Sequence, residues 1–264
     1  MGRAQTEKSK KYQEVAWDRF WERVSFEAYI EKETFHDRVL HGRLKQLVEL
    51  SMKGNASCRF LETGGAFSKV LYRLSREELP GLELYGLDNS VRAALETGIK
   101  LSKNKIRIVI GDVFKSPIKA GTLQGVASFG LIEHFAEPAE YLIRCREMLA
   151  PGGRLVVGYP IYCGLTGCLQ RWFNPSAFEY HYSLPAAEMA EIIAGLGFSE
   201  VNADYFGPFN PNMIDWGEKK IARLAMYGFF AAIRPTEWLC RLSGLSLSSR
   251  WFSSYVIATG EKPG

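Results

Sequence analysis

Short apolar runs alternate with amphipathic stretches of helical periodicity along most of this 264-residue chain. Runs of this length suit buried strands, and the stretches between them repeat apolar residues at the spacing of a helix face. Strands that alternate with helices pair in parallel through right-handed crossovers, so the pattern predicts an open α/β sheet. The expected strands are residues 59–61, 84–87, 106–110, 125–129, 154–158, 198–205 and 255–259.

The segments on either side of this alternation are helical in pattern. Residues 1–55 are expected to form an N-terminal helical lid, and residues 56–264 the main domain. A helical insertion is expected at about residues 207–250, with one helix over 221–233 and a second near 238–242. An insertion of this length before the last strand is normally a lid, a partner surface or the wall of a substrate site.

The composition excludes several classes of protein and partner. The 33 Lys and Arg residues against 29 Asp and Glu give a formal charge of +4, without the concentrated basic face that nucleic acid requires. The longest apolar run, Leu224 to Ile233, is half of the roughly 20 residues of a membrane span, so no stable membrane insertion is expected. Five cysteines without a CxxC pair, and no apolar stretch after the basic N-terminus, predict free thiols in a cytoplasmic protein.

Acidic residues follow the first three expected strands. Glu62 precedes a glycine turn, Gly64-Gly65, which lets the backbone approach a ligand closely. Asp88 ends the second strand, where a carboxylate can accept from two ribose hydroxyls, and Asp112 follows the third, where it can accept from an adenine amino group. Ligands of such sheets bind at the carboxyl ends of the strands, so we expect the three carboxylates to converge.

A dinucleotide fingerprint fits this turn poorly. It requires glycine at positions 64, 66 and 69, and the chain has Gly64, Ala66 and Lys69. Glu62, two residues before the first glycine, would repel a pyrophosphate and attract an ammonium group. An NAD-dependent oxidoreductase is therefore disfavoured.

Five segments in succession resemble the motifs of class I S-adenosylmethionine-dependent methyltransferases. The resemblance runs from about Cys58 to Gly158 and implies a Rossmann-like, seven-stranded, mostly parallel sheet with helices on both faces, and S-adenosylmethionine as cofactor. The segments are Glu62-Thr63-Gly64-Gly65-Ala66, Asp88, Gly111-Asp112-Val113, Ser128–Phe135 (SFGLIEHF) and Leu149-Ala150-Pro151-Gly152-Gly153.

The resemblance also implies which residues bind the cofactor. They are Glu62, Gly64 and Gly65 at the methionine amino group, Asp88 at the ribose, Asn89, Asp112 and Val113 at the adenine, and Gly130 near the methionine portion. The family usually has glycine where this chain has Ala66 and Ser68, which predicts a looser turn. Tyr12 and Trp17 of the N-terminal helices are expected to close over the cofactor and shelter its cation.

Plainer interpretations exist for the same residues. Gly64-Gly65 is also an ordinary strand–helix turn, Asp88 or Asn89 can cap the next helix, and Asp112 can be a turn residue. The cofactor interpretation is favoured because the acidic groups fall at consecutive strand ends.

Two histidines are the candidates for catalysis. His134 follows the fourth strand in a Glu-His pair and can remove a proton at neutral pH, or instead pack or hydrogen-bond the loop. His181 lies in a segment, Glu179–Tyr182, that resembles the border of the acceptor pocket in relatives. His36 and His41 are expected at the surface. No metal-ligand cluster is evident from the spacing, so no metal is expected.

The aromatic insertion favours a small, hydrophobic acceptor, of the secondary-metabolite kind, methylated on oxygen or nitrogen. Core packing or a homodimer face explains the same aromatics. Their identities are Trp216, Met226, Tyr227, Phe229, Phe230, Trp238, Trp251 and Phe252. The alternatives to a methyltransferase are a protein of this fold that catalyses a non-methylating reaction such as a cyclisation, and a non-catalytic scaffold. The sequence leaves open the acceptor, the atom methylated and the oligomeric state.

Overall fold

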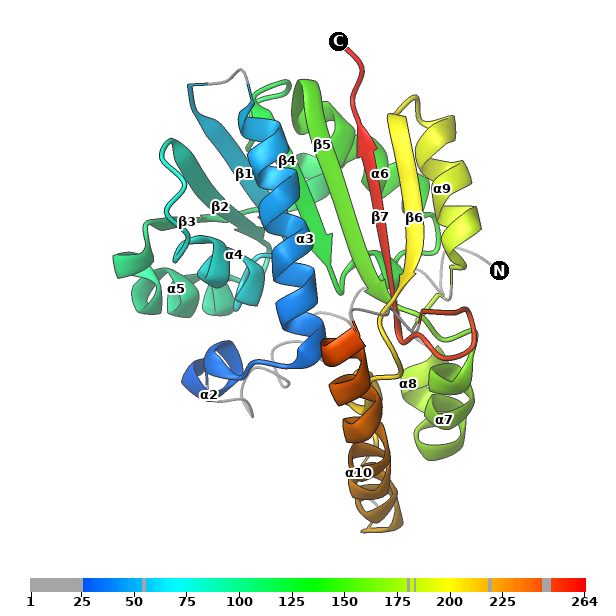
Figure 1. Cartoon of the computed structure of the whole chain (residues 1–264). Coiled ribbons are helices and arrows are strands. Elements are labelled where there is room, and N and C mark those ends of the chain that lie inside the picture. The colour runs from blue at the N-terminus through cyan, green and yellow to red at the C-terminus, as the bar shows by residue number, and fades with distance from the viewer. Residues whose placement is uncertain (1–25, 54–55, 180, 183, 218–219, 244–247) are drawn as a thin grey trace. The chain divides into compact units, whose positions relative to one another are not determined.

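The computed structural model describes residues 26–53, 56–179, 181–182, 184–217, 220–243 and 248–264. Seven strands form one sheet in the order β3-β2-β1-β4-β5-β7-β6 (Figure 1). They are β1 (Cys58–Thr63), β2 (Leu82–Asp88), β3 (Ile106–Ile110), β4 (Leu123–Phe129), β5 (Leu149–Pro160), β6 (Ser199–Phe206) and β7 (Tyr255–Glu261). The seven-stranded, Rossmann-like α/β fold expected from the sequence is confirmed.

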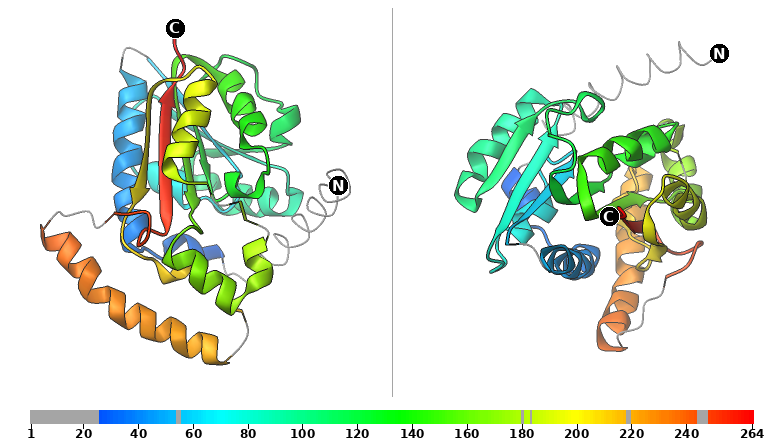
Figure 2. Two further views of the ribbon diagram at one scale, coloured as in Figure 1. Left: turned by 90° about the vertical axis from the view of Figure 1, so that its right-hand side faces the viewer. Right: turned by 90° about the horizontal axis from the view of Figure 1, so that it is seen from above.

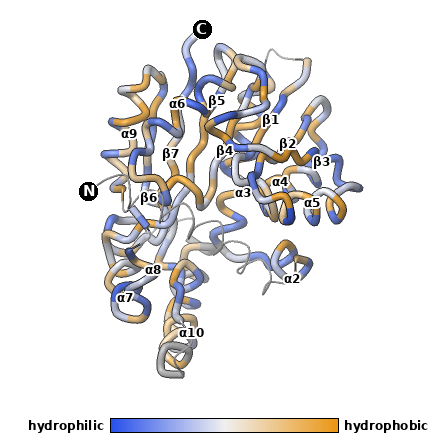
Figure 3. The backbone as a smooth tube through the Cα atoms, turned by 180° about the vertical axis from the view of Figure 1, so that it is seen from behind, coloured by the Kyte–Doolittle hydropathy of each residue, from blue (hydrophilic) through white to orange (hydrophobic). Residues whose placement is uncertain are grey.

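Two of the described helices precede β1, and the others fall between the strands that follow, as the alternation predicts. They are α2 (Phe26–Glu31), α3 (Phe35–Met52), α4 (Lys69–Leu74), α5 (Val91–Lys100), α6 (Pro138–Met148), α7 (Leu165–Phe173), α8 (Pro175–Glu179), α9 (Ala186–Gly195) and α10 (Lys220–Ser243). The colours of α5 and α9 alternate along the tube in Figure 3, as expected for helices with one apolar face. Among the described residues, no helix is both long and apolar enough to cross a bilayer.

The chain divides into two compact units. The first contains residues 1–128 and 144–154, and the second contains residues 129–143 and 155–264. The predicted division near residue 55 is a different kind of boundary, between a lid and a catalytic domain, and it stays a prediction.

In the first unit, β1 pairs in parallel with both β2 and β4, and β2 pairs in parallel with β3. Helix α3 packs on β1 and α4, and α5 packs on β2 and β3. Serine side chains begin the two helices that follow β1 and β2: Ser68 accepts from the Leu71 amide, and Ser90 from the Ala93 amide. These caps fix where each strand–helix turn ends, and the predicted ligand site lies in those turns.

In the second unit, β6 pairs with β7 antiparallel, and α9 lies alongside both strands (Figure 2, left). The residues between β6 and β7 form the expected helical insertion, which shares an apolar core with α7. The buried members of that core are Leu169, Phe209, Ile214 and Trp216, and Ala225, Met226, Phe229 and Ile233 of α10 pack against it.

The prediction of two separate helices in the insertion is wrong, because α10 continues through Pro235 to Ser243. Proline removes one backbone hydrogen bond and normally breaks a helix. Both Pro235 and Ala231, whose carbonyl loses its partner, are exposed in this helix, so water can hydrate the freed group. The proline therefore costs less here than its position in the sequence suggests.

Gly65 is the residue that permits the turn after β1 to lie against β2. A Cβ atom at this position would stand 2.7 Å from the Glu62 carbonyl oxygen and 2.7 Å from the Gly86 Cα atom. Both are backbone atoms, which cannot rotate away. A Cβ atom at Gly42, within α3, would meet no other atom within 4 Å.

We therefore expect Gly65→Ala to lower the free energy of unfolding by about 1–3 kcal/mol, as overpacking usually does. Gly42→Ala is the matched control and should raise it by up to about 1 kcal/mol, because alanine is the better helix former. Urea unfolding followed by circular dichroism measures both. Equal stabilities for the two variants would contradict the close approach of this turn to β2.

Candidate functional site

The carboxyl ends of β1, β2 and β3 lie at one edge of the first unit. Thr63 at the end of β1 is in register with Leu87, and Asp88 at the end of β2 is in register with Ile110. Parallel pairing therefore brings the turns that follow these strands together, as predicted.

Glu62 is the buried acidic group of this edge. Its side chain is 3% exposed, and it accepts a hydrogen bond from the Ser68 hydroxyl. Burial raises the pKa of Glu62 to about 8; repulsion by Asp88 adds to this, and the Ser68 bond opposes it. Among the residues that the structure describes, no cation pairs with this carboxyl group, so a positively charged ligand would favour its ionised form.

The glycine turn is fixed by bonds to the neighbouring strand. Gly64 has a φ of 70°, and its amide donates to the Leu87 carbonyl at 2.8 Å; the Gly65 amide donates to the same oxygen at 3.2 Å. Phe67 also has a positive φ, 57°, which is uncommon for a residue with a side chain. Its amide donates to the Thr97 hydroxyl at 3.0 Å, which helps to hold this conformation.

Asp88 connects this turn to the next one. One of its oxygens accepts from the Ala66 amide at 3.1 Å, and the other accepts from the Ser90 amide at 2.9 Å. Ser90, and not Asp88 or Asn89, is the N-cap of α5, so the capping alternative for these two residues is not what the structure contains. A carboxylate oxygen can accept more than one hydrogen bond, so a ligand hydroxyl can bond the same group.

Asp112 and Val113 follow β3 in a short 3₁₀ helix, η2 (Val113–Lys115). Asp112 is its N-cap and accepts from the Phe114 amide at 2.9 Å, so it is a turn residue as well as a candidate ligand. Its side chain is exposed, as is that of Asn89, whereas Val113 is half-buried. A planar ring at this edge would meet one apolar and two polar side chains.

The departures from the usual glycine pattern do not loosen the turn. Ser68 has a φ of −68°, which needs no glycine, and its hydroxyl both caps α4 and bonds Glu62. Ala66 is buried and donates to Asp88. Lys69 directs its ammonium to Asp37 at 3.5 Å and over the Tyr29 ring at 4.5 Å, toward α2 and α3. The looser turn predicted from these positions is therefore not present.

Tyr12 and Trp17, the predicted lid residues, lie outside the described part of the chain. Helix α2 instead brings Phe26 and Tyr29 to this region. The Phe26 and Phe67 rings meet edge to face at 5.0 Å, and burial, with the charges of Asp37 and Glu62, raises the pKa of Tyr29 to about 12. These two aromatics could not be predicted from the sequence, because α2 has only six residues and is too short to show a clear helical repeat of apolar residues.

The second unit contains the two predicted catalytic histidines, and it brings them together. His134 ends the 3₁₀ helix η3 (Ile132–His134), and its ring centroid lies 4.8 Å from that of His181. The Tyr182 amide donates to the Glu133 carbonyl at 2.8 Å and so holds the His181 segment beside η3. Gly130, the predicted contact of the methionine portion, precedes η3 with a φ of 65°.

Glu133 lies close to both histidines and was not predicted as a site residue. Its side chain is 2% exposed, and burial raises its pKa to about 8. The Tyr162 ring lies 4.8 Å from His181, and burial raises the pKa of that phenol as well. The signal that could have identified Glu133 is its position next to His134, since an acid in a buried apolar segment requires a partner.

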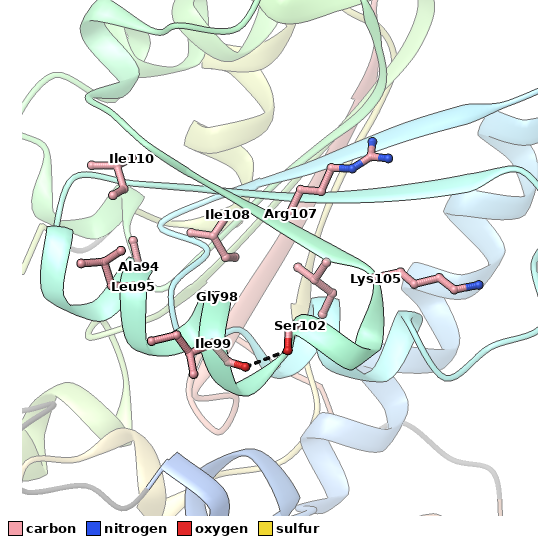
Figure 4. A pocket seen from close by; sticks show the side chains of 10 residues that line it. Ala94, Leu95, Gly98, Ile99, Ser102, Lys105, Arg107, Ile108 and Ile110 are labelled. Atoms are coloured by element: carbon pink, nitrogen blue, oxygen red, sulfur yellow. Dashed lines mark hydrogen bonds between the residues drawn. The ribbon is translucent and has the colours of Figure 1, made fainter.

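A hollow away from these residues is lined by α5, β3 and the residues between them (Figure 4). It has a volume of about 900 Å³ and is lined by apolar residues such as Leu95, Ile99 and Ile108. No predicted site residue lines it, so it carries no argument about the ligand. The predicted aromatic wall is divided: Trp216, Met226 and Phe229 belong to the core of the insertion, whereas Tyr227, Trp238, Trp251 and Phe252 are exposed.

Comparison with known proteins agrees with this geometry. Residues 61–157 match the family model described as a methyltransferase domain. A segment is 30% identical over 108 residues to an uncharacterized 37.1 kDa protein in transposon TN4556 of Streptomyces fradiae, covering 40% of this chain and 31% of that protein. Another is 28% identical over 119 residues to the ubiquinone biosynthesis O-methyltransferase of Roseobacter denitrificans, covering 42% and 47%. The chain thus spans about a third to a half of the curated relatives that it matches.

Solved structures share the fold at low sequence identity. A SAM-dependent methyltransferase from Archaeoglobus fulgidus superposes with a TM-score of 0.55 at 17% identity, over 90% of this chain and 98% of the other. Phosphoethanolamine N-methyltransferase 2 of Haemonchus contortus, in complex with S-adenosyl-L-methionine, gives 0.55 at 14% identity, over 91% and 60%.

The buried Glu62 carboxyl predicts a pH dependence of stability. Between pH 4.5 and 8 the unfolded chain releases this proton and the folded chain keeps it, so this group lowers the free energy of unfolding as pH rises, by up to about 1.4 kcal/mol per pH unit. Glu62→Gln removes this contribution.

The variant should therefore gain stability relative to the unsubstituted protein as pH rises from 5 to 8. Urea unfolding at four pH values measures the difference, and the contribution of Glu133 cancels because both proteins contain it. Stability curves that stay parallel across this range would show that Glu62 does not retain its proton in the fold.

Proposed function

We propose that this chain, a member of the class I S-adenosylmethionine-dependent methyltransferases by its domain match and fold, transfers a methyl group to oxygen or nitrogen of a small, hydrophobic acceptor. The observation that carries the proposal is the buried Glu62 carboxyl beside a glycine turn, with Asp88 and Asp112 at the neighbouring strand ends. This set offers negative charge for an ammonium group and acceptor oxygens for a ribose and an adenine.

The residues present fit S-adenosylmethionine group by group. Glu62 and the backbone of Gly64 and Gly65 would hold the methionine amino group, because a cation would supply the charge partner that the described residues do not give the buried carboxyl. Asp88 would accept from the ribose hydroxyls, because a carboxylate oxygen can accept more than one hydrogen bond. Asn89, Asp112 and Val113 would surround the adenine, and Gly130 would lie near the methionine portion.

The cofactor supplies an electrophilic methyl on a sulfonium, so the protein's task is to position a nucleophile in line, exclude water and handle its proton. We assign this task to His134 and His181, which lie side by side in the second unit. An imidazole can remove a proton or ligate a cation. In either role it would act at the nucleophilic atom of the acceptor.

The surroundings of His181 support a hydrophobic acceptor. The Tyr162 ring lies next to it, with its centroid 4.8 Å from that of His181, and the Phe178 ring lies 6.3 Å from that of Tyr162. Aromatic walls with few polar groups suit an apolar, ring-bearing molecule. The curated relatives named for ubiquinone biosynthesis O-methylation support an oxygen acceptor of that kind.

A non-methylating reaction such as a cyclisation is the alternative that the altered glycine turn suggested. Ser68 and Ala66 fit the turn without strain and support Glu62 and Asp88, so this turn no longer favours the alternative.

Cofactor binding is tested by thermal stability. S-adenosylmethionine and its demethylated product should each stabilise the protein, by about 2.7 kcal/mol at a hundredfold excess over Kd, and NAD should not. Asp88→Ala should abolish the shift, whereas Asp204→Ala, at an exposed position of β6, should leave it unchanged. A retained shift in Asp88→Ala would overturn the ribose assignment.

The catalytic assignment is tested by turnover. With a hydroxyl- and amine-bearing aromatic acceptor panel, His134→Ala and His181→Ala should each lower kcat about 10²–10⁴-fold, the usual contribution of a catalytic imidazole. Their affinity for S-adenosylmethionine should not change. His41→Gln, which removes the hydrogen bond between His41 of α3 and Glu77, is the control. Full turnover in both alanine variants would remove these residues from the mechanism.

A further inference from the structure

Glu133, His134 and His181 form a cluster of three metal-ligating side chains in the second unit. One ligand atom from each residue lies within 4.8 Å of the other two. The Glu133 and His134 side chains approach to 4.0 Å, between Oε1 and Nε2. Atoms bound to one tetrahedral ion at about 2.1 Å lie roughly 3.4 Å apart, so small side-chain rotations would bring the three to one centre.

An independent observation points to a missing ligand at this cluster. The Glu133 side chain is 2% exposed, yet its Oε2 atom has no hydrogen-bond partner among the described residues. Buried carboxylate oxygens are almost always paired, because an unpaired one forfeits its hydration. A bound cation would satisfy this oxygen.

The backbone around the cluster is built to keep it together. The Tyr182 amide bonds the Glu133 carbonyl at 2.8 Å, which ties the residue after His181 to the residue before His134. A Cβ atom at Gly130 would stand 3.8 Å from Glu133 Oε1, so the absence of a side chain there leaves space beside the carboxylate.

We propose that Glu133, His134 and His181 bind one divalent transition-metal ion. Two imidazoles and one carboxylate suit Zn²⁺, Mn²⁺ or Co²⁺ better than Mg²⁺ or Ca²⁺, which prefer oxygen ligands throughout. Three protein ligands leave at least one coordination position open for water or substrate.

If the proposed methyltransferase function is correct, the inferred ion also indicates which class of acceptor the protein methylates. A hydroxyl oxygen on the open position would lose its proton to solvent more easily, because a metal ion lowers the pKa of a bound hydroxyl. Its lone pair would form the new C–O bond as the C–S bond breaks, and sulfur would keep the bonding pair. The site then favours O-methylation of a phenol or alcohol, with the histidines acting as ligands.

Metal binding is measured without turnover. The full chain, freed of metal with a chelator and dialysed, is titrated with MnCl₂, and free Mn²⁺ is followed by electron paramagnetic resonance. We expect one site per chain, with Glu133→Gln and His181→Ala each weakening binding at least tenfold and His41→Gln leaving it unchanged. Circular dichroism verifies that the variants are folded, and Glu133→Gln keeps the shape of the side chain.

A Co²⁺ titration gives the second readout, because ligand-field absorption bands report coordination by imidazole. Absence of saturable Mn²⁺ and Co²⁺ binding up to 1 mM by the unsubstituted chain would overturn the metal site, whatever the enzyme does with S-adenosylmethionine. So would binding that survives in both Glu133→Gln and His181→Ala. If the metal binds as described but S-adenosylmethionine gives no thermal shift, the metal site stands and the methyltransferase proposal fails.

Discussion

The desolvation of one carboxyl group, Glu62, determines the character of the predicted cofactor site. A carboxylate removed from water without a cation is so costly that the group keeps its proton to about pH 8. The fold keeps Glu62 buried through its hydrogen bond with Ser68, the glycine turn against β2 and the two amides that bond Asp88. A positively charged ligand offsets the desolvation of the Glu62 carboxylate. An ammonium-bearing cofactor therefore suits this site, and a pyrophosphate does not.

The second unit contains another buried carboxyl group. Glu133 is as deeply buried as Glu62, but it stands beside two imidazoles, whereas Glu62 stands beside a serine and an aspartate. We propose a different cation for each environment: an organic ammonium at Glu62 and a metal ion at Glu133.

Local sequence signals were sufficient for most of the fold. Alternating apolar and amphipathic segments predict all seven strands, because each strand and helix leaves its own periodicity in the chain. The acidic strand ends could be predicted because parallel pairing places them at one edge. The positive φ of Phe67 could not, since it depends on the Thr97 hydroxyl from α5. Nor could the meeting of His134 with His181, because a long stretch of sequence separates them and only tertiary packing joins them.

The account of the cofactor site is tested most directly by proton linkage in calorimetry. Binding of S-adenosylmethionine at pH 6.5 should release close to one proton as Glu62 ionises against the ammonium group, so the observed enthalpy should vary with the ionisation enthalpy of the buffer. The Glu62→Gln variant should show weaker binding without this release. Tight binding whose enthalpy is the same in every buffer, or binding unaffected by the substitution, would contradict it.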